Sequence, residues 1–359
     1  MKRKMAVLIS IILVLPCFSA CTSSQKASTG SATSSQTEKT ENKESEKSGD
    51  DKKSYTIKLA HGAAEAVPMH KGALKFKEVV EEQSDGRIKV EVYPNQMLGG
   101  DREFTEAVQM GNIQMGIPSC TPVANFVSEL YLFDTPFAFS SREQAFEILD
   151  GEVGQKIMAT LSKVGIKGLG IWENGFRNLT CNDEPKTTPE KLRGVKVRTM
   201  ENDVHLEIWK SLGANPTPMA FGELYTALQQ KTIDAQENPM SLIYNTKYYE
   251  VQDYVVETRH IYTPYLVLIN EEFFNSLDEE DQNIIFSAYN EATKLQREVA
   301  ATDEDECREK LNELCEVVQL TDEEREVFIE KTAHVREMVK EKCGNPELAD
   351  AFFAAIDAK

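Results

Sequence analysis

Two arginines lie at the ends of apolar segments that are predicted to be strands, and they are the strongest candidates for chemistry in this sequence. Arg198 ends the run that begins at Val195, and Arg177 follows a run that begins near Ile166. An arginine in this place can present two parallel N–H donors to a carboxylate, which a lysine cannot reproduce. The alternative for Arg198 is a surface residue paired with Glu201, and the spacing does not distinguish these two interpretations.

Polar side chains at other predicted element ends are candidates for binding the rest of a small ligand. Asn238 precedes a proline at a predicted strand-to-helix break, where its amide atoms would point into a cleft. His61 ends the first predicted strand, and Asp101 begins a helix after a Gly-Gly turn. Both suit contact with ligand hydroxyls, although Asp101 equally suits helix capping. Glu201 follows Arg198 closely and is a further candidate ligand contact.

The sequence lacks the local signatures of several enzyme classes. It contains no Gly-x-Ser-x-Gly motif, P-loop, His-Glu-x-x-His motif or dinucleotide fingerprint. The histidines show no metal-ligand spacing, so we expect no metal and no cofactor. The chain has 59 acidic and 40 basic residues and a net charge of -19. A chain this acidic repels phosphate backbones, so we expect no nucleic-acid partner.

The body of the chain alternates predicted strands and helices, which is typical of a parallel α/β sheet. The first set has strands at 56–61, 87–93 and 113–117 and helices at 68–83 and 101–110. The second set has strands near 166–172, 195–198 and 265–269, with helices beginning near 188 and spanning 201–212 and 221–230. On the helix at 68–83, Leu74, Phe76, Val79 and Val80 are predicted to share one apolar side.

The last quarter of the chain is predicted to form long charged helices. A capping box at 276–279 predicts a helix that runs past Cys315, and a second at 321–324 predicts a helix to about Lys342. Two α/β sets with a long helix returning across both predict two lobes. Ligands bind at strand ends in the crevice of such sheets.

The N-terminus has the pattern of a bacterial lipoprotein signal. Lys2, Arg3 and Lys4 precede a short apolar run, and Phe18-Ser19-Ala20-Cys21 resembles the lipobox before a lipidated cysteine. We therefore predict a signal peptide at 1–20 and a lipid-anchored disordered tether at 21–54, because residues 22–54 are almost entirely polar. The alternative is an ordinary signal peptide that happens to contain a cysteine.

Five cysteines remain in the body of the chain, so at least one thiol is free. They are Cys120, Cys181, Cys307, Cys315 and Cys343. Cys307 and Cys315 lie too far apart along one helix to bridge each other, but either could reach Cys343. Small buried thiols are the preferred interpretation for most of them.

Several motifs together resemble the solute-binding proteins of tripartite ATP-independent periplasmic (TRAP) transporters, the DctP-type family. They are the Leu-Gly-Gly-Asp-Arg-Glu turn at 98–103, the strand at 192–198, the Pro-Met-Ala-Phe run at 218–221 and the Gln-Glu-Asn-Pro run at 236–239. The resemblance covers essentially all of residues 55–345. It implies an α/β, two-lobed venus-flytrap periplasmic binding protein fold with a long helix spanning both lobes. Lobe I is expected at 55–174 plus about 264–302, and lobe II at 175–263 plus about 303–359.

The resemblance also assigns roles to individual residues. It implies that Arg198 clamps the ligand carboxylate and that Arg177, on the paired strand, supports the same anion. Phe221 would line the pocket, and Asn238 would hydrogen-bond the anionic end of the ligand. Ser119 falls in the region where the first lobe touches ligand, and its hydroxyl suits contact with a ligand hydroxyl.

The function implied is that of an extracytoplasmic receptor and not of an enzyme. It would capture a carboxylate-bearing small molecule, a C4-dicarboxylate or a sugar acid such as a uronate, and deliver it to small and large TRAP membrane subunits for ion-gradient-driven uptake. We expect a monomer, anchored by its lipid on the outer face of the cytoplasmic membrane. The alternatives are a same-fold receptor for an ATP-driven importer or a sensor, and a secreted glycan-acting enzyme.

Overall fold

The structure, a computed structural model, describes residues 53–358. The predicted signal peptide, Cys21 and nearly all of the predicted tether lie outside the described residues. Within residues 53–358, no helix is both long enough and apolar enough to cross a membrane.

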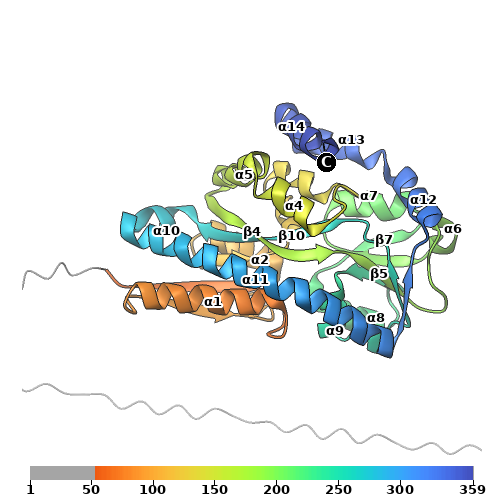
Figure 1. Cartoon of the computed structure of the whole chain (residues 1–359), viewed down its shortest axis with the longest axis horizontal. Helices are drawn as coiled ribbons and strands as arrows, with labels where there is room; N and C mark the ends of the chain where they lie inside the picture. The colour runs from red at the N-terminus through yellow and green to blue at the C-terminus, as the bar shows by residue number, and fades with distance from the viewer. Residues whose placement is uncertain (1–52, 359) are drawn as a thin grey trace, which may run out of the picture. The chain divides into compact units, whose positions relative to one another are not determined.

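Five strands form the first sheet, in the order β2-β1-β3-β10-β4 (Figure 1). They are β1 (Tyr55–His61), β2 (Ile88–Tyr93), β3 (Met115–Ile117), β4 (Ile166–Phe176) and β10 (Tyr262–Asn270). β1 is parallel to β2 and β3, whereas β10 is antiparallel to β3 and β4. The predicted strand–helix alternation at the start of the body is therefore confirmed, and its three strands are parallel as predicted. The sheet as a whole is mixed, because β10 runs antiparallel to its neighbours.

Six short strands form the second sheet, in the order β11-β9-β5-β8-β6-β7. They are β5 (Asn178–Cys181), β6 (Lys196–Thr199), β7 (Asn215–Pro218), β8 (Ala235–Asn238), β9 (Tyr254–Glu257) and β11 (Glu316–Gln319). β6 is parallel to β7 and β8, and β5 is antiparallel to β8 and β9. Arg198 lies within β6, Arg177 directly precedes β5, and β8 separates these two strands. The prediction that Arg177 lies on the strand paired with that of Arg198 is therefore wrong.

The chain passes between the two sheets in two neighbouring segments, from β4 to β5 and from β9 to β10, and a backbone hydrogen bond connects these segments. β4 ends at Phe176 and β5 begins at Asn178, so Arg177 is the single residue between them. The Arg177 N–H donates to the carbonyl oxygen of Ile261 at 2.9 Å, in the segment through which the chain returns from β9 to β10. The site described below lies where these sheets meet.

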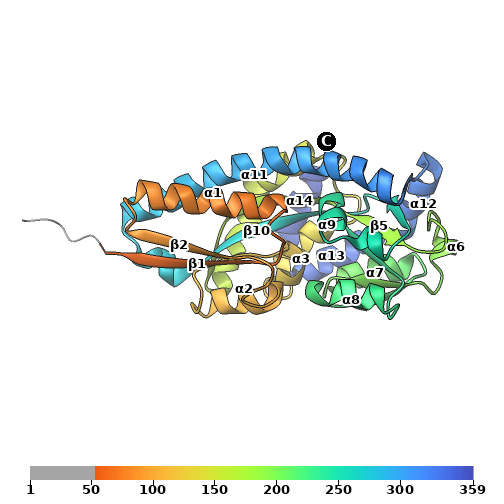
Figure 2. The ribbon, with the colours of Figure 1, turned by 90° about the horizontal axis from the view of Figure 1, so that it is seen from below.

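One long helix packs against elements of both sheets. α11 (Glu279–Leu314) contacts α1 (Pro68–Gln83) and β4 of the first sheet, and α9 (Met240–Asn245) and β11 of the second. Figures 1 and 2 show it passing alongside both groups of strands. The predicted long helix spanning both lobes is therefore confirmed.

Two predicted helix boundaries are wrong. α11 is capped by Asp278, whose side chain accepts a hydrogen bond from the N–H of Asp281, while Ser276 ends the preceding helix α10 (Glu271–Ser276). The carboxylate two residues later is the N-cap in place of Ser276. α11 also ends at Leu314, before Cys315.

The capping box at Thr321 is confirmed, but the helix it opens is shorter than predicted. Thr321 accepts from the N–H of Glu324, and the Glu324 side chain accepts from the N–H of Thr321. α12 (Asp322–Thr332) ends ten residues before Lys342, and α13 (Val335–Cys343) begins after a break. α13 contacts both α7 (Asp203–Ser211) and the 3-10 segment η1 (Ser128–Asp134), so the predicted lobe boundary near residue 303 stays a prediction.

Shorter helices fill the remaining connections. They are α2 (Asp101–Gln109), α3 (Cys120–Val123), α4 (Arg142–Leu149), α5 (Glu152–Ala159), α6 (Pro189–Leu192), α7 (Asp203–Ser211), α8 (Leu224–Gln229) and α14 (Pro346–Asp357), with η1 (Ser128–Asp134) and η3 (Phe221–Glu223) as 3-10 segments. α2 and the helix α7 confirm predicted helices. The helix predicted at 221–230 is η3 followed by α8.

α1 has the predicted bounds, but one of its predicted core residues is exposed. Phe76, Val79 and Val80 are buried, whereas Leu74 is 44% exposed. At 100° per residue, Leu74 lies about 200° around the helix from Phe76 and cannot share its face. The prediction that Leu74 shares one side of the helix with these residues was therefore wrong.

The five cysteines of the body are free thiols. Four of them are buried, and Cys315 is half-buried. The alternative disulfide from Cys307 or Cys315 to Cys343 is therefore not formed, and the interpretation as small buried thiols is confirmed for four of the five.

Candidate ligand-binding site

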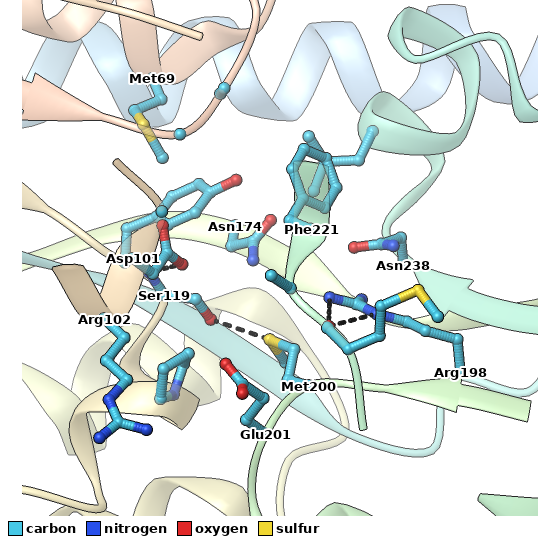
Figure 3. A pocket seen from close by; sticks show the side chains of 18 of the residues that line it. Met69, Asp101, Arg102, Ser119, Asn174, Arg198, Met200, Glu201, Phe221 and Asn238 are labelled. Carbon is cyan, nitrogen blue, oxygen red and sulfur yellow. Dashed lines mark hydrogen bonds between the residues drawn. The ribbon is translucent and has the colours of Figure 1, made fainter. Parts of the chain in front are cut away.

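A cavity lies between the two sheets, at the carboxyl ends of several strands (Figure 3). Its space free of atoms is about 680 Å³, open solvent at its mouth included. The residues that bear on its chemistry are Gly62, Asp101, Arg102, Glu103, Ser119, Asn174, Arg177, Arg198, Met200, Glu201, Met219, Phe221, Asn238 and Tyr265.

Arg198 carries the uncompensated positive charge of this cavity. It is 2% exposed, and its Nε and Nη2 atoms donate to the carbonyl oxygen of Met219 at 2.9 and 2.7 Å. Nη1 is buried without a hydrogen-bond partner. The Met219 carbonyl thus occupies one edge of the guanidinium and leaves the Nη1–Nη2 edge for a carboxylate. The alternative pairing with Glu201 is wrong, because Arg198 is buried and no acidic side chain among residues 53–358 forms an ion pair with it.

Arg177 also lines the cavity, but its charge is already balanced. Its guanidinium pairs with the carboxylate of Glu237, with Nε to Oε2 at 2.5 Å and Nη2 to Oε1 at 3.0 Å. Nη2 also donates to Oδ1 of Asn238 at 3.0 Å. Both partners of the ion pair are at most 1% exposed. Arg177 therefore adds positive potential near Arg198 while remaining fixed by the second sheet.

Glu237 belongs to a buried network that continues away from the cavity. His260 Nε2 lies 3.2 Å from Glu237 Oε2, and His205 Nδ1 lies 3.9 Å from Oε1. His205 Nε2 in turn lies 3.2 Å from Oδ1 of Asp134. Burial by itself would raise the pKa of Glu237, but Arg177 and the two histidines outweigh it and hold that pKa well below its usual range. Glu237 is therefore ionised at neutral pH.

Asp101 lies on the opposite side of the cavity from Arg198 (Figure 3). It is the first residue of α2, after a turn in which Gly99 has φ +99°, and a Cβ there would lie 2.7 Å from Cβ of Glu103. Its Oδ2 accepts a hydrogen bond from the N–H of Ser119 at 3.0 Å. Burial raises the pKa of Asp101 to about 6, against the lowering effects of that hydrogen bond and of Arg198.

A family model described as bacterial extracellular solute-binding protein, family 7 (DctP), matches residues 59–342. The chain belongs to this family. Among its relatives is the 2,3-diketo-L-gulonate-binding periplasmic protein YiaO of Escherichia coli, 34% identical over 79% of this chain and 87% of that protein. The predicted resemblance to TRAP solute-binding proteins is thereby confirmed, and DctP proteins are receptors, not a class of enzyme.

Solved structures of DctP-type proteins share the fold. The sugar acid binding protein DctPAm from Advenella mimigardefordensis, in complex with galactonate, superposes with a TM-score of 0.83 at 36% identity, covering 86% of this chain and 99% of that one. A TRAP periplasmic solute-binding protein from Sulfurospirillum deleyianum with bound succinate gives 0.80 at 33% identity, covering 84% and 99%. The predicted two-lobed α/β fold is confirmed by both.

The structure brings most of the predicted ligand-binding residues of this DctP protein to the cavity. Arg198, Arg177, Asn238, Phe221, Asp101, Ser119 and Glu201 all line it. His61 is not among the lining residues: it is buried, with Nε2 3.1 Å from Nδ1 of His70, and burial followed by the His70 charge lowers its pKa to about 3. The structure therefore does not place the His61 side chain at the cavity.

Several of these residues are tied to protein partners as well as to the cavity. Asn238 Nδ2 donates to Oε1 of Gln236, and its Oδ1 accepts from Arg177, so the amide orients the arginine. Ser119 Oγ lies 3.5 Å from Sδ of Met200, which connects the first sheet's side of the cavity to the second's. Glu201 is exposed at the edge of the cavity.

Met219 and Asn174 also line the cavity, but neither was predicted as a site residue from the sequence. Met219 acts through its backbone carbonyl, which fixes Arg198, and a side-chain type does not reveal such a role. Asn174 stands in β4 two residues before Phe176, and its polar side chain near the end of the strand was an available signal. Across the described residues, no group of three or more His, Cys, Asp or Glu side chains is placed to hold a metal ion.

Proposed function

We propose that this DctP-family receptor binds an organic acid through Arg198 and hands it to TRAP membrane subunits. The observation that carries the proposal is the buried Nη1 atom of Arg198: it has no hydrogen-bond partner, and no acid within residues 53–358 forms an ion pair with this guanidinium. Burying an unpaired charge is costly, so the guanidinium is poised to gain from an anionic ligand. The relatives bound to galactonate and to succinate support a carboxylate as that anion.

The ligand would act by drawing the two sides of the cleft together. A solute held by Arg198 on one side and by Asp101 or Ser119 on the other has contacts that exist only when both sides are near. Such differential contacts shift the population toward a closed receptor. The closed form would then be the form that docks on the membrane subunits.

Thermal unfolding in the presence of ligands tests this function. We expect at least one dicarboxylate, aldonate or uronate to raise the midpoint, because a ligand stabilises the folded state by RT ln(1 + [L]/Kd). The matched control is the neutral polyol of the same chain length, which lacks the carboxylate and should produce no shift. A panel in which no acid raises the midpoint, or in which the neutral polyol works equally well, would contradict the proposal.

We also propose that the mature protein is a monomer held at the outer face of the cytoplasmic membrane by lipid on Cys21. Cys21 lies outside the described residues, so the support comes from the sequence: the motif that ends at the cysteine and the polar segment that follows it. Stable anchoring takes more than one acyl chain, which a diacylated cysteine supplies.

Replacing Cys21 with serine should abolish anchoring. Serine lacks the thiol that carries the lipid, so the variant should move from the detergent phase to the aqueous phase, or accumulate as precursor, in phase partition of whole-cell extracts. Cys17→Ser is the matched control, because Cys17 would leave with the signal peptide. Unchanged detergent partition of Cys21→Ser would rule out lipidation at that residue.

A further inference from the structure

The two sides of the cavity have opposite charge, and each charge lacks a protein partner of opposite sign. Of the arginines that line it, Arg177 is paired with Glu237, and Arg102 is largely exposed and paired with Glu106 at 3.1 Å. Only Arg198 is left to receive an anion. The cavity therefore offers one strong site for a carboxylate, on the side of the second sheet.

The opposite side offers a carboxylate instead of a second cation. Within residues 53–358, no lysine, arginine or histidine lies within ion-pair distance of Asp101. Its Oδ2 is engaged by the Ser119 N–H, while Oδ1 faces Gly62, where a Cβ would lie 3.0 Å away. Gly62 brings no side chain against Oδ1, and no group within residues 53–358 donates a hydrogen bond to this oxygen. The nearby acids Glu103 and Glu201 add further negative charge to the lining.

We propose that Asp101 sets the substrate class of this receptor: the cavity takes a polyhydroxylated acid with a single carboxylate, a hexonate or hexuronate, in preference to a dicarboxylate. This inference rests on the proposed function, because it needs the ligand carboxylate at Arg198. A hydroxyl at the far end of the ligand donates to the free oxygen of Asp101. A second carboxylate at that end meets a like charge with no cation between them, and this repulsion weakens binding.

The preference for a ligand with one carboxylate over a ligand with two should weaken at low pH. The groups that face Asp101 are the Ser119 N–H, Arg198, Tyr265 and its helix neighbours Arg102 and Glu103. Burial raises the pKa of Asp101 to about 6. Below that pH the carboxyl is neutral and donates a hydrogen bond, so a second ligand carboxylate becomes an acceptor instead of a repelled charge.

A matched pair of ligands tests the proposal by calorimetry. Galactonate and galactarate share a chain and its hydroxyls and differ in whether the last carbon is an alcohol or a carboxylate. At about pH 7.5 we expect galactonate to bind at least about tenfold more tightly than galactarate, and at about pH 5 we expect that ratio to fall severalfold, while the ligand carboxylates remain largely ionised. Asp101→Asn keeps an oxygen for the Ser119 N–H but removes the charge, and should reduce the ratio and abolish its pH dependence.

The control is Glu272→Gln, which removes one negative charge from an exposed position at the start of α10 and should leave the ratio unchanged. Galactarate binding as tightly as galactonate at neutral pH would overturn the role of Asp101, as would an Asp101→Asn variant that keeps both ratio and pH dependence. Circular dichroism checks whether the Asp101→Asn variant is folded. If it is not, Asp101→Ser provides a second variant. If neither acid binds, this inference fails, whereas the proposed function fails only when no acid of the wider panel binds. If both acids bind undiminished to Arg198→Ala, the proposed function itself fails and this inference fails with it.

Discussion

Replacing Arg198 with alanine should reduce affinity for the cognate acid by about 10²–10⁴, the equivalent of about 3–5 kcal/mol. The ligand carboxylate would then lie in the cleft without its cation. Arg198→Lys should also bind much more weakly, although it keeps the charge. One ammonium group cannot both hold the Met219 carbonyl, which now takes two donors, and present two parallel donors to a carboxylate.

Isothermal titration calorimetry measures this effect directly. The matched control is Arg193→Lys, an exposed arginine five residues earlier in the same segment, which should bind as the wild type does. If Arg198→Ala binds within about threefold of wild type, a change below 1 kcal/mol, the carboxylate is held elsewhere in the cleft.

Glu237→Gln should lower the free energy of unfolding by about 3–5 kcal/mol at neutral pH, because it leaves the buried Arg177 guanidinium without a counter-charge. This loss in the free energy of unfolding should become smaller as the pH falls. The pKa of Glu237 is held below its usual 4.5 in the folded protein, so its ionised form stabilises the fold at pH values above about 4.5. That stabilisation disappears as the pH falls toward the folded-state pKa.

Urea unfolding of wild type and variant at several pH values checks the prediction. The difference between them should be constant near neutrality and shrink below about pH 4.5, by about 1.4 kcal/mol per pH unit. Glu152→Gln is the control, since its pair with Lys156 is exposed and its removal should have no measurable effect. A difference that persists unchanged in acid would show that Glu237 stabilises the fold by packing and not by charge.

Elements with local signals could be predicted from the sequence. α1 begins with proline and buries one apolar side, and the reciprocal capping box fixes Thr321 at the start of α12. Ser276 failed as a cap because Asp278, an equally good N-cap, lies two residues closer to the helix. Local patterns thus locate a helix better than they choose between neighbouring capping residues.

The short strands of the second sheet could not be predicted in the same way. β8 has the sequence Ala-Gln-Glu-Asn, which is typical of an exposed loop, yet all four residues are buried. Their burial depends on Arg177, about sixty residues earlier in the chain, and on His260. The family resemblance located Arg198 and Asn238 at the cavity, whereas the ion pair that neutralises Arg177 depends on long-range partners that spacing does not reveal.

The position of Arg177 has a consequence for protein engineering. The residue whose backbone links the two sheets is also the residue whose side chain is locked to Glu237. A bending motion between the two sheets would act on the backbone of this residue, whose side chain also lines the cavity that contains Arg198. In chimaeras that exchange lobes between DctP relatives, Arg177 and Glu237 should accordingly come from the same parent, so that their ion pair is preserved.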